Sequence, residues 1–287
     1  MKLATFEHAG RRRIGLIREN EMLDLAALDP RLPSSMEGFL ALGADGLALA
    51  HDVLQRAPKG VNLAVVRLCA PVSCPRKFMG IGGNFRSHLE EVKAPPPKHQ
   101  IWFNKQVTCV NGPFDPIHLP RASSQLDYEG EMAIVIGQRC RHVSPEDAYK
   151  VITGYCICND VSVRDWQLRA FTATLGKSFD THGPIGPWIT TTDEIDDPHS
   201  LQIRTWVDGE LRQSGSTSEF IFSIPQMISE LSTVFTLEPG DIFSTGSPAG
   251  VGAWMTPPKY LSAGQVVRVE IEGLGHIENR VVEEPFG

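Results

Sequence analysis

The stretch LDYEGEMAIVIG, at positions 126–137, constrains the fold most strongly because it joins three acidic residues to an unbroken apolar run. Asp127, Glu129 and Glu131 stand at alternate positions, and alternate side chains of a β-strand point to the same face. The apolar run that follows, positions 132–136, has no polar face and is typical of a buried strand. A strand here would crowd three carboxylates onto one face, where like charges repel and an unpaired buried charge is costly.

A divalent cation would offset this charge. Two glutamates on one strand face and a third carboxylate can form an open Mg²⁺ or Mn²⁺ site, because both ions prefer oxygen ligands. Asp160 can supply the third carboxylate, since it follows a second apolar segment, positions 151–158, that can pair beside the first. The alternative is that Glu129 and Glu131 simply face solvent on a half-exposed strand.

The composition excludes several classes of protein. The formal net charge of -7 argues against a nucleic-acid partner, because phosphate binding needs a basic surface. No stretch approaches the roughly 18 apolar residues of a membrane span, and the N-terminus carries acids and arginines where a signal peptide is apolar, so we expect a cytoplasmic protein. The six cysteines include no Cys-x-x-Cys pair, which argues against a zinc site. Cys156 and Cys158 are expected to be free thiols in one packed layer.

The 287 residues are expected to form one large domain or two unequal ones. Residues 1–70 predict a small α+β domain that starts with a β-meander turning at residues 10–11. The arginines at 11–13 fit a solvated turn between the two strands. Short helices are expected next, at residues 35–42 and 47–54.

The prolines at positions 71–75 break this pattern and mark the expected linker, so that residues 71–287 form a second, larger domain. Its local signals predict few helices: one beginning at Ser144, and one at 224–235 whose apolar residues share a face. Most of the rest is strand and turn, with a hairpin expected at residues 208–209. The pattern is that of a β-rich α+β protein.

His88 and Glu91 lie three positions apart after a glycine-rich turn, and on a helix they share a face. A carboxylate that holds an imidazole can tune it as a general base near neutral pH, whereas the alternative is an ordinary surface pair. The glycines do not fit Gly-x-Gly-x-x-Gly, and neither Gly-x-Ser-x-Gly nor His-Glu-x-x-His occurs. A dinucleotide fingerprint, a serine-nucleophile elbow and a zinc-protease motif are therefore excluded.

Two lysines and one loop have the chemistry to bind an anion. Lys105 in WFNKQ and Lys177 in LGKSF can project into a cleft and neutralise a carboxylate or an oxyanion. The small residues at 244–252 let backbone N–H groups approach an anion. Surface lysines and a turn that binds nothing are the alternatives.

Six blocks, in this order from Arg76 to the C-terminus, resemble the fumarylacetoacetate hydrolase superfamily: GIGGNFRSHLEE, WFNKQVTCVNGPFDPIHLP, LDYEGEMAIVIG, ICNDVSVRDWQ, GKSFDTHGPIGPW and FSTGSPAGVG. The resemblance implies a C-terminal domain of the mixed β-roll or β-sandwich type, preceded by a small α+β domain and assembled as a homodimer.

The resemblance also implies roles for individual residues. Glu129, Glu131 and Asp160, from the E-x-E and N-D-V-S blocks, would hold Mg²⁺ or Mn²⁺. His88 and Glu91 would activate water, on a lid that orders when substrate binds. The other matching positions are the active-site lysine, Lys177, and the polar substrate contacts, Lys105, Arg164, Gln167 and Thr245 or Ser247.

Ile81 stands near the place where the most studied members carry a further acid, which favours the branch that acts on smaller oxo acids. The implied reaction is hydrolysis of the C3–C4 bond of a 2,4-dioxo acid, either an acylpyruvate or a 2,4-diketo-3-deoxy sugar acid. Its products would be pyruvate, or a related 2-oxo acid, and a carboxylic acid.

The same site would stabilise an enolate in other reactions as well. Decarboxylation of oxaloacetate-type acids, keto–enol isomerisation, and isomerisation or hydration of 2-hydroxydienoates remain open alternatives. A non-catalytic scaffold of the same fold is the alternative from another class.

Overall fold

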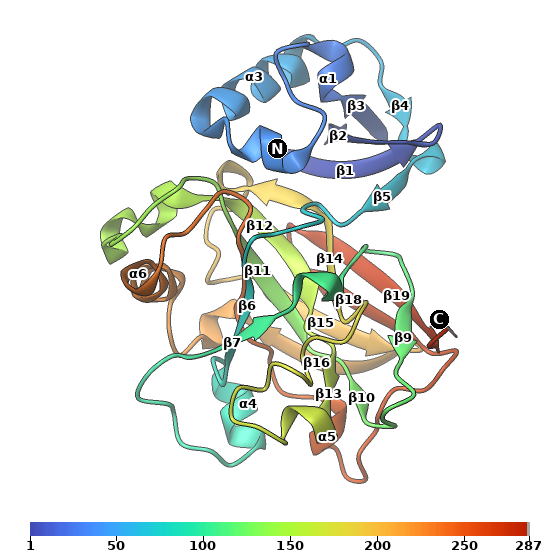
Figure 1. The fold of residues 1–287 in the computed structure, drawn as a ribbon, viewed down its shortest axis with the longest axis vertical. Helices are drawn as coiled ribbons and strands as arrows, with labels where there is room; N and C mark the ends of the chain where they lie inside the picture. The colour runs from blue at the N-terminus through green and yellow to red at the C-terminus, as the bar shows by residue number, and fades with distance from the viewer. Residues whose placement is uncertain (286–287) are drawn as a thin grey trace.

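In the computed structural model, which describes residues 1–285, the N-terminal part of the chain (blue) forms a first lobe at one end of the molecule and the rest forms a larger β-rich body (Figure 1). A mixed sheet of twelve strands runs through both parts. Ten of its strands follow one another in the order β4 (Val61–Asn62), β3 (Glu21–Asp24), β2 (Arg11–Arg18), β1 (Lys2–His8), β14 (Gly183–Thr191), β12 (Ile152–Asn159), β11 (Gly130–Ile136), β17 (Ile242–Ser244), β6 (Phe78–Gly82) and β7 (Ile101–Lys105). The other two are β5 (Arg67–Cys69), which pairs with β1, and β8 (Val110–Asn111), which pairs with β14.

Two smaller sheets complete the body. A five-stranded sheet has the order β16 (Glu210–Ser216), β15 (Gln202–Val207), β18 (Val266–Ile271), β19 (Gly275–Glu283) and β9 (Ile117–Leu119), and a pair is formed by β10 (Leu126–Asp127) and β13 (Ser162–Val163). The α-helices are α1 (Leu25–Leu28), α2 (Met36–Leu40), α3 (Gly43–Arg56), α4 (Arg86–Glu91), α5 (Arg164–Gln167) and α6 (Ile224–Val234). Short 3₁₀ helices are η1 (Leu63–Val65), η2 (Val107–Cys109), η3 (Pro145–Val151), η4 (Thr192–Glu194), η5 (Thr217–Glu219) and η6 (Gly252–Trp254). The predicted β-rich α+β class is confirmed.

β11 and its neighbour β12 are buried on both faces because each lies between two apolar clusters. Met132 and Ile134 face the cluster formed with α6 and the five-stranded sheet, whereas Ala133 faces the cluster formed with residues 1–70. Cys156 and Cys158 of β12 are free thiols buried in the second cluster, as predicted. The continuous apolar runs in these two strands follow from burial on both faces.

Local signals placed one helix and one hairpin correctly. The Ser223 hydroxyl accepts the N–H of Gln226 and caps α6, which ends at Val234, one residue early. The helix buries Ile224, Met227, Ile228 and Leu231 of the predicted apolar face, whereas Val234 is exposed. Asp208 and Gly209 have φ values of 50° and 79°, the left-handed conformation of a type I′ turn between β15 and β16. The short helices expected in the first lobe correspond to α2 and to part of α3.

Two local predictions need correction. The first turn lies at Ala9 and Gly10, which both have positive φ, so the arginines at 11–13 belong to β2 and not to the turn. The segment after Ser144 forms the 3₁₀ helix η3 instead of an α-helix. The Asp147 N–H bonds to the Ser144 carbonyl, three residues back, which is the hydrogen-bond pattern of a 3₁₀ helix.

The stretch at 126–137 is two strands, β10 and β11, and not the single strand that its alternation predicts. The interruption falls at Tyr128 and Glu129. The Tyr128 side chain is fully buried, and the Glu129 N–H donates to the side chain of Asn159 on β12, at 3.1 Å, instead of to a main-chain carbonyl. The break sets Asp127 apart from the two glutamates.

The first lobe is joined to the body by main-chain pairing. Leu3 of β1 pairs with Ile189 of β14, so the sheet continues across the predicted domain boundary. The division at residue 70 stays a prediction. Within residues 1–285 no helix is both long enough and apolar enough to cross a membrane.

Candidate metal centre and substrate cavity

Three carboxylates predicted as metal ligands meet at the junction of β11 and β12. Antiparallel pairing sets Gly130 opposite Asn159, which brings the flanking Glu129, Glu131 and Asp160 together. One carboxylate oxygen of each lies within 4.8 Å of the others, and all three side chains are buried. The predicted pairing of the two apolar segments is therefore confirmed.

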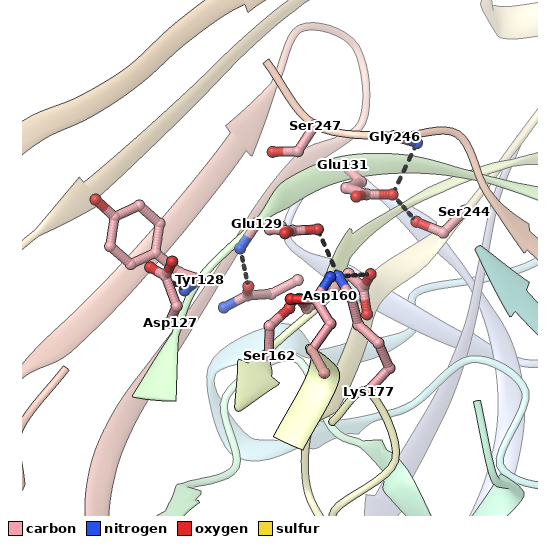
Figure 2. Close-up of polar contacts among 12 residues, drawn as sticks. Asp127, Tyr128, Glu129, Glu131, Asp160, Ser162, Lys177, Ser244, Gly246 and Ser247 are labelled. Atoms are coloured by element: carbon pink, nitrogen blue, oxygen red, sulfur yellow. Dashed lines mark hydrogen bonds and ion pairs between the residues drawn. The ribbon is translucent and has the colours of Figure 1, made fainter. Parts of the chain in front are cut away.

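Two buried cations pair with two of these carboxylates. Lys177 Nζ lies 2.7 Å from both Glu129 Oε2 and Asp160 Oδ2 (Figure 2). Arg164 Nη1 donates to Glu129 Oε1 at 2.6 Å. Burial alone would raise the pKa of Glu129, but the charges of Lys177 and Arg164 outweigh it and lower that pKa below its usual range. Glu129 is therefore held as a carboxylate.

Glu131 lacks such a partner among the residues that the structure describes. Its Oε2 accepts the hydroxyl of Ser244 and the N–H of Gly246, the latter at 2.9 Å (Figure 2). Burial and the neighbouring charges of Asp160 and Glu129 raise the pKa of Glu131 well above its ordinary value. Within residues 1–285, Glu131 thus has no cationic side chain paired with it to offset its charge, and a hard divalent cation with oxygen ligands would fit that role.

Lys105 lies behind this group and does not line the cavity in which a substrate would sit. Its ammonium donates to Asp160 Oδ1 at 2.6 Å and to the main-chain carbonyls of Lys177 and His182. All three of its donors are used within the protein. In this arrangement Lys105 orients Asp160 and the Lys177 main chain, and the geometry lends no support to its predicted contact with a substrate.

Two of these carboxylates, Glu129 and Glu131, line the floor of a cavity of about 450 Å³, and Asp160 does not line it. Polar groups gather at its floor and one wall, where Gln125, Arg164, Gln167, Lys177 and Ser247 are found. The remaining walls are mostly apolar: Ile81, Leu89, Val92, Ile101, Phe103, Leu168 and Trp254.

The predicted His88–Glu91 pair is formed on α4. The imidazole Nδ1 lies 3.0 Å from Glu91 Oε2, and the other Glu91 oxygen accepts the Gly250 N–H at 2.9 Å. His88 lines the cavity. The carboxylate fixes the ring through one nitrogen and leaves Nε2 for another partner.

Of the two alternatives in the small-residue loop, Ser247 lines the cavity and Thr245 does not. The Thr245 hydroxyl donates to the Met132 carbonyl at 2.8 Å, which ties β17 to β11. The Ser247 hydroxyl accepts from Gln213 Nε2 at 2.7 Å. The structure therefore favours Ser247 as the polar contact.

Several residues that hold the carboxylates and the cavity wall in place were not predicted individually. Ser244 and Gly246, which bind Glu131, lie in the loop whose small residues did suggest an anion. Gln213 lies on the hairpin strand β16 and reaches Ser247 and the Gly130 N–H, and no local pattern marks it. Its role depends on how the five-stranded sheet packs on β11.

A buried carboxylate triad beneath an open cavity, flanked by cationic side chains, is typical of an enzyme that binds a divalent cation and a small anionic substrate. The chain belongs to the fumarylacetoacetate hydrolase family: the model of the fumarylacetoacetate (FAA) hydrolase C-terminal region matches residues 77–282. The resemblance seen in the sequence is confirmed.

Individual relatives cover nearly the whole chain. The mitochondrial oxaloacetate tautomerase fahd2 of Xenopus laevis is 42% identical over 274 residues, which are 94% of this chain and 86% of that protein. A solved fumarylacetoacetate hydrolase of Exiguobacterium antarcticum has a TM-score of 0.88 at 39% identity, over 99% of this chain and 100% of its own. Maleylpyruvate hydrolase of Sphingobium sp. SYK-6, solved with manganese(II) and pyruvate, has a TM-score of 0.82 at 33% identity, over 99% of this chain and 100% of its own.

Proposed function

We propose that this protein is a divalent-metal-dependent enzyme that interconverts the keto and enol forms of a small 2-oxo acid of the oxaloacetate type. The observation that carries the proposal is the buried Glu129–Glu131–Asp160 group at the floor of a cavity whose wall presents His88. The Xenopus relative, named for oxaloacetate tautomerisation, supports this substrate class over the 2,4-dioxo acids first inferred.

Removing a proton from C3 of a 2-oxo acid leaves an enolate, whose negative charge gathers on the C2 oxygen. Mg²⁺ or Mn²⁺ held by Glu129, Glu131 and Asp160 would supply Lewis-acid stabilisation of that charge. Lys177 adds a fixed positive charge at the same floor. Its bonds to Glu129 and Asp160 hold its position.

His88 is the proposed base. Its Nε2 would take the C3 proton and return it to the C2 oxygen, so that the product is an isomer and no atom is gained or lost. Glu91 fixes the ring and stabilises the imidazolium that forms. Arg164, Gln167 and Ser247 are proposed to bind the substrate's carboxylate and oxo groups.

Hydrolysis of the C3–C4 bond of a 2,4-dioxo acid is the second candidate. The His88–Glu91 pair supports it, since the same base can activate a water molecule for attack at C4. The likeness to maleylpyruvate hydrolase supports it too. Decarboxylation of oxaloacetate-type acids needs the enolate stabilisation alone and would not depend on His88.

The test follows the ultraviolet absorbance of enol-oxaloacetate with Mg²⁺ or Mn²⁺, alongside pyruvate release from acylpyruvates and from oxaloacetate. We expect the wild type to speed the loss of enol and His88→Gln to slow it about 100-fold or more. His51→Gln, an exposed histidine on α3, is the matched control. Without tautomerisation, pyruvate release from acylpyruvates would favour the second candidate and pyruvate release from oxaloacetate would favour decarboxylation. No turnover of any acid would leave the non-catalytic scaffold.

We also infer a homodimer and a cytoplasmic location, as the sequence predicts. The Xenopus relative is named as a mitochondrial protein. Fractionation of the source cell and light scattering of the purified protein test the two inferences separately.

A further inference from the structure

Asp127 is the one acid of its stretch that the proposed mechanism does not use, although it is completely buried. Its carboxylate accepts four N–H groups. Oδ1 receives the main-chain N–H groups of Tyr128 and Gly252, at 2.9 and 2.8 Å. Oδ2 receives Nε of Arg164 and the N–H of Ala253, at 2.8 and 2.9 Å.

A carboxylate has about four lone-pair positions, and all four of these are filled. Asp127 therefore has no free acceptor for a metal ion or a substrate. It also lies outside the group of three carboxylates that could share an ion. Asp127 must therefore act through the groups whose N–H donors it binds.

Those groups belong to two separate walls of the cavity. Arg164 begins α5, whose Gln167 also lines the cavity, and Arg164 Nη1 donates to Gln167 at 2.9 Å. Ala253 and Trp254 form the second wall in η6, about half of the Trp254 surface being exposed. One buried side chain thus joins two walls that come from distant parts of the sequence.

The fit around this side chain is tight. A Cβ atom added to Gly252 would lie 2.7 Å from Asp127 Oδ1 and 2.3 Å from the Lys259 carbonyl. The Gly252 carbonyl in turn accepts the Lys259 N–H at 2.9 Å, next to Tyr260, another residue of the cavity wall. A small shift of Asp127 would therefore move the whole η6 segment.

We propose that Asp127 is a positioning residue that fixes the Arg164 guanidinium and the η6 wall relative to one another and so sets the affinity for the 2-oxo acid. The inference rests on the proposed function for its kinetic part only. An ion pair of Arg164 with Asp127 directs Nη1 at Glu129 and Gln167, because the guanidinium is a rigid plane. Asp127 contacts no metal-ligand carboxylate directly, so we expect substrate binding to depend on it far more than metal binding does.

The test compares Asp127→Asn with the wild type. The amide keeps the shape but can accept on one side only, so either the Arg164 side or the Gly252 side is lost. We expect KM for oxaloacetate to rise about tenfold or more while kcat changes less than about threefold. Asp165→Asn, a neighbouring acid on α5 that bonds Ser123 and does not line the cavity, should leave both values unchanged.

Two further readouts separate positioning from a general loss of structure. Hydrogen exchange of residues 250–260 should be about tenfold faster in Asp127→Asn, with β11 and β12 unchanged. The dissociation constant for Mn²⁺ should stay within about threefold, because no metal ligand is altered. A tenfold loss of Mn²⁺ affinity would instead make Asp127 part of the metal site and overturn the proposal.

Arg164→Gln provides a test that does not depend on a well-folded Asp127 variant. Because part of the Asp127 effect acts through Arg164, Asp127→Asn should raise KM less in the Arg164→Gln background than in the wild type, whereas independent effects would multiply in full. If hydrogen exchange of residues 250–260 is the same in Asp127→Asn as in the wild type, the positioning role is overturned whatever the kinetic result. If the wild type turns over no oxo acid, the proposed function fails. The hydrogen-exchange rates alone then test whether Asp127 positions the η6 segment.

Discussion

Glu131 is the carboxylate of the triad without a lysine or arginine partner in the part of the chain that the structure describes. Its raised pKa has its origin in burial and in the charges of Asp160 and Glu129. We predict that Glu131→Gln stabilises the metal-free protein at pH 8 by about 1–3 kcal/mol, because a buried charge is removed. The same change should weaken Mn²⁺ binding about 100-fold, since one of three oxygen ligands loses its charge.

Urea unfolding with a chelator present and Mn²⁺ titration measure the two effects. Glu230→Gln, an exposed glutamate on α6, serves as the control and should change neither. A variant that is less stable without metal, or that binds Mn²⁺ as tightly as the wild type, would contradict the assignment of Glu131 as a ligand.

The buried side chain of His182 should make the stability of the protein depend on pH. It is fully buried, its Nε2 donates to the His118 carbonyl at 2.8 Å, and burial lowers its pKa from 6.5 to about 3. Between pH 6.5 and about 3 the unfolded chain binds a proton that the folded protein does not bind. Its contribution to stability is therefore present above pH 6.5 and is lost as the pH falls through this window.

His182→Gln keeps a donor for the His118 carbonyl but does not titrate. The free energy of unfolding of the wild type should fall more steeply with acid than that of the variant, by up to about 1.4 kcal/mol per pH unit. Urea unfolding from pH 7 to pH 4 measures both slopes. Parallel slopes would show that the folded protein accepts a proton at His182.

The sequence predicted the catalytic candidates better than the residues that orient them. The Glu129–Glu131–Asp160 carboxylates and the His88–Glu91 pair are each close in sequence, or carried by blocks that a family resemblance marks. Asp127 seemed to share the face of the glutamates, yet its partners at Gly252 and Ala253 lie 125 and 126 residues away. Contacts at that separation depend on packing, which no local pattern encodes.

Among the elements, the β15–β16 hairpin shows what a local signal can determine. Gly209 has φ of 79°, and an added Cβ would meet nothing within 4 Å, so only backbone strain opposes a side chain there. We predict that Gly209→Ala lowers the free energy of unfolding by about 1 kcal/mol. Gly209→Asn should cost less, because asparagine tolerates the left-handed region. Thermal unfolding of both variants checks the order, and equal costs would contradict a strained turn.

Elements with such local signals, the α6 helix and this hairpin, were predicted within a residue. The break between β10 and β11 was not, because it results from the burial of Tyr128 and from the side chain of Asn159, which lies on another strand. Likewise, nothing local shows that β1 continues the sheet of the larger body. Strand partners separated by nearly two hundred residues are set by the tertiary fold alone.

At the scale of the molecule, the first lobe and the larger body share one apolar cluster. Leu3 and Leu16 from the first lobe lie in the same buried cluster as Val135, Cys156 and Ile189 from the body. The pairing of β1 with β14 crosses the same junction. Cooperative unfolding of the whole chain is expected, because neither part can bury this surface alone.

Leu3→Ala tests this coupling. It should lower the free energy of unfolding by about 2–5 kcal/mol, the cost of a buried cavity, and the loss should appear in the unfolding of the larger body.

All five tryptophans lie beyond residue 70, so their fluorescence reports on that body. A Trp188→Phe background removes the one tryptophan that contacts Lys2. Leu42→Ala, at a side chain that is 39% exposed, should shift the transition little. A fluorescence transition that ignores Leu3→Ala would mean that the lobes unfold independently, with their boundary near residue 70.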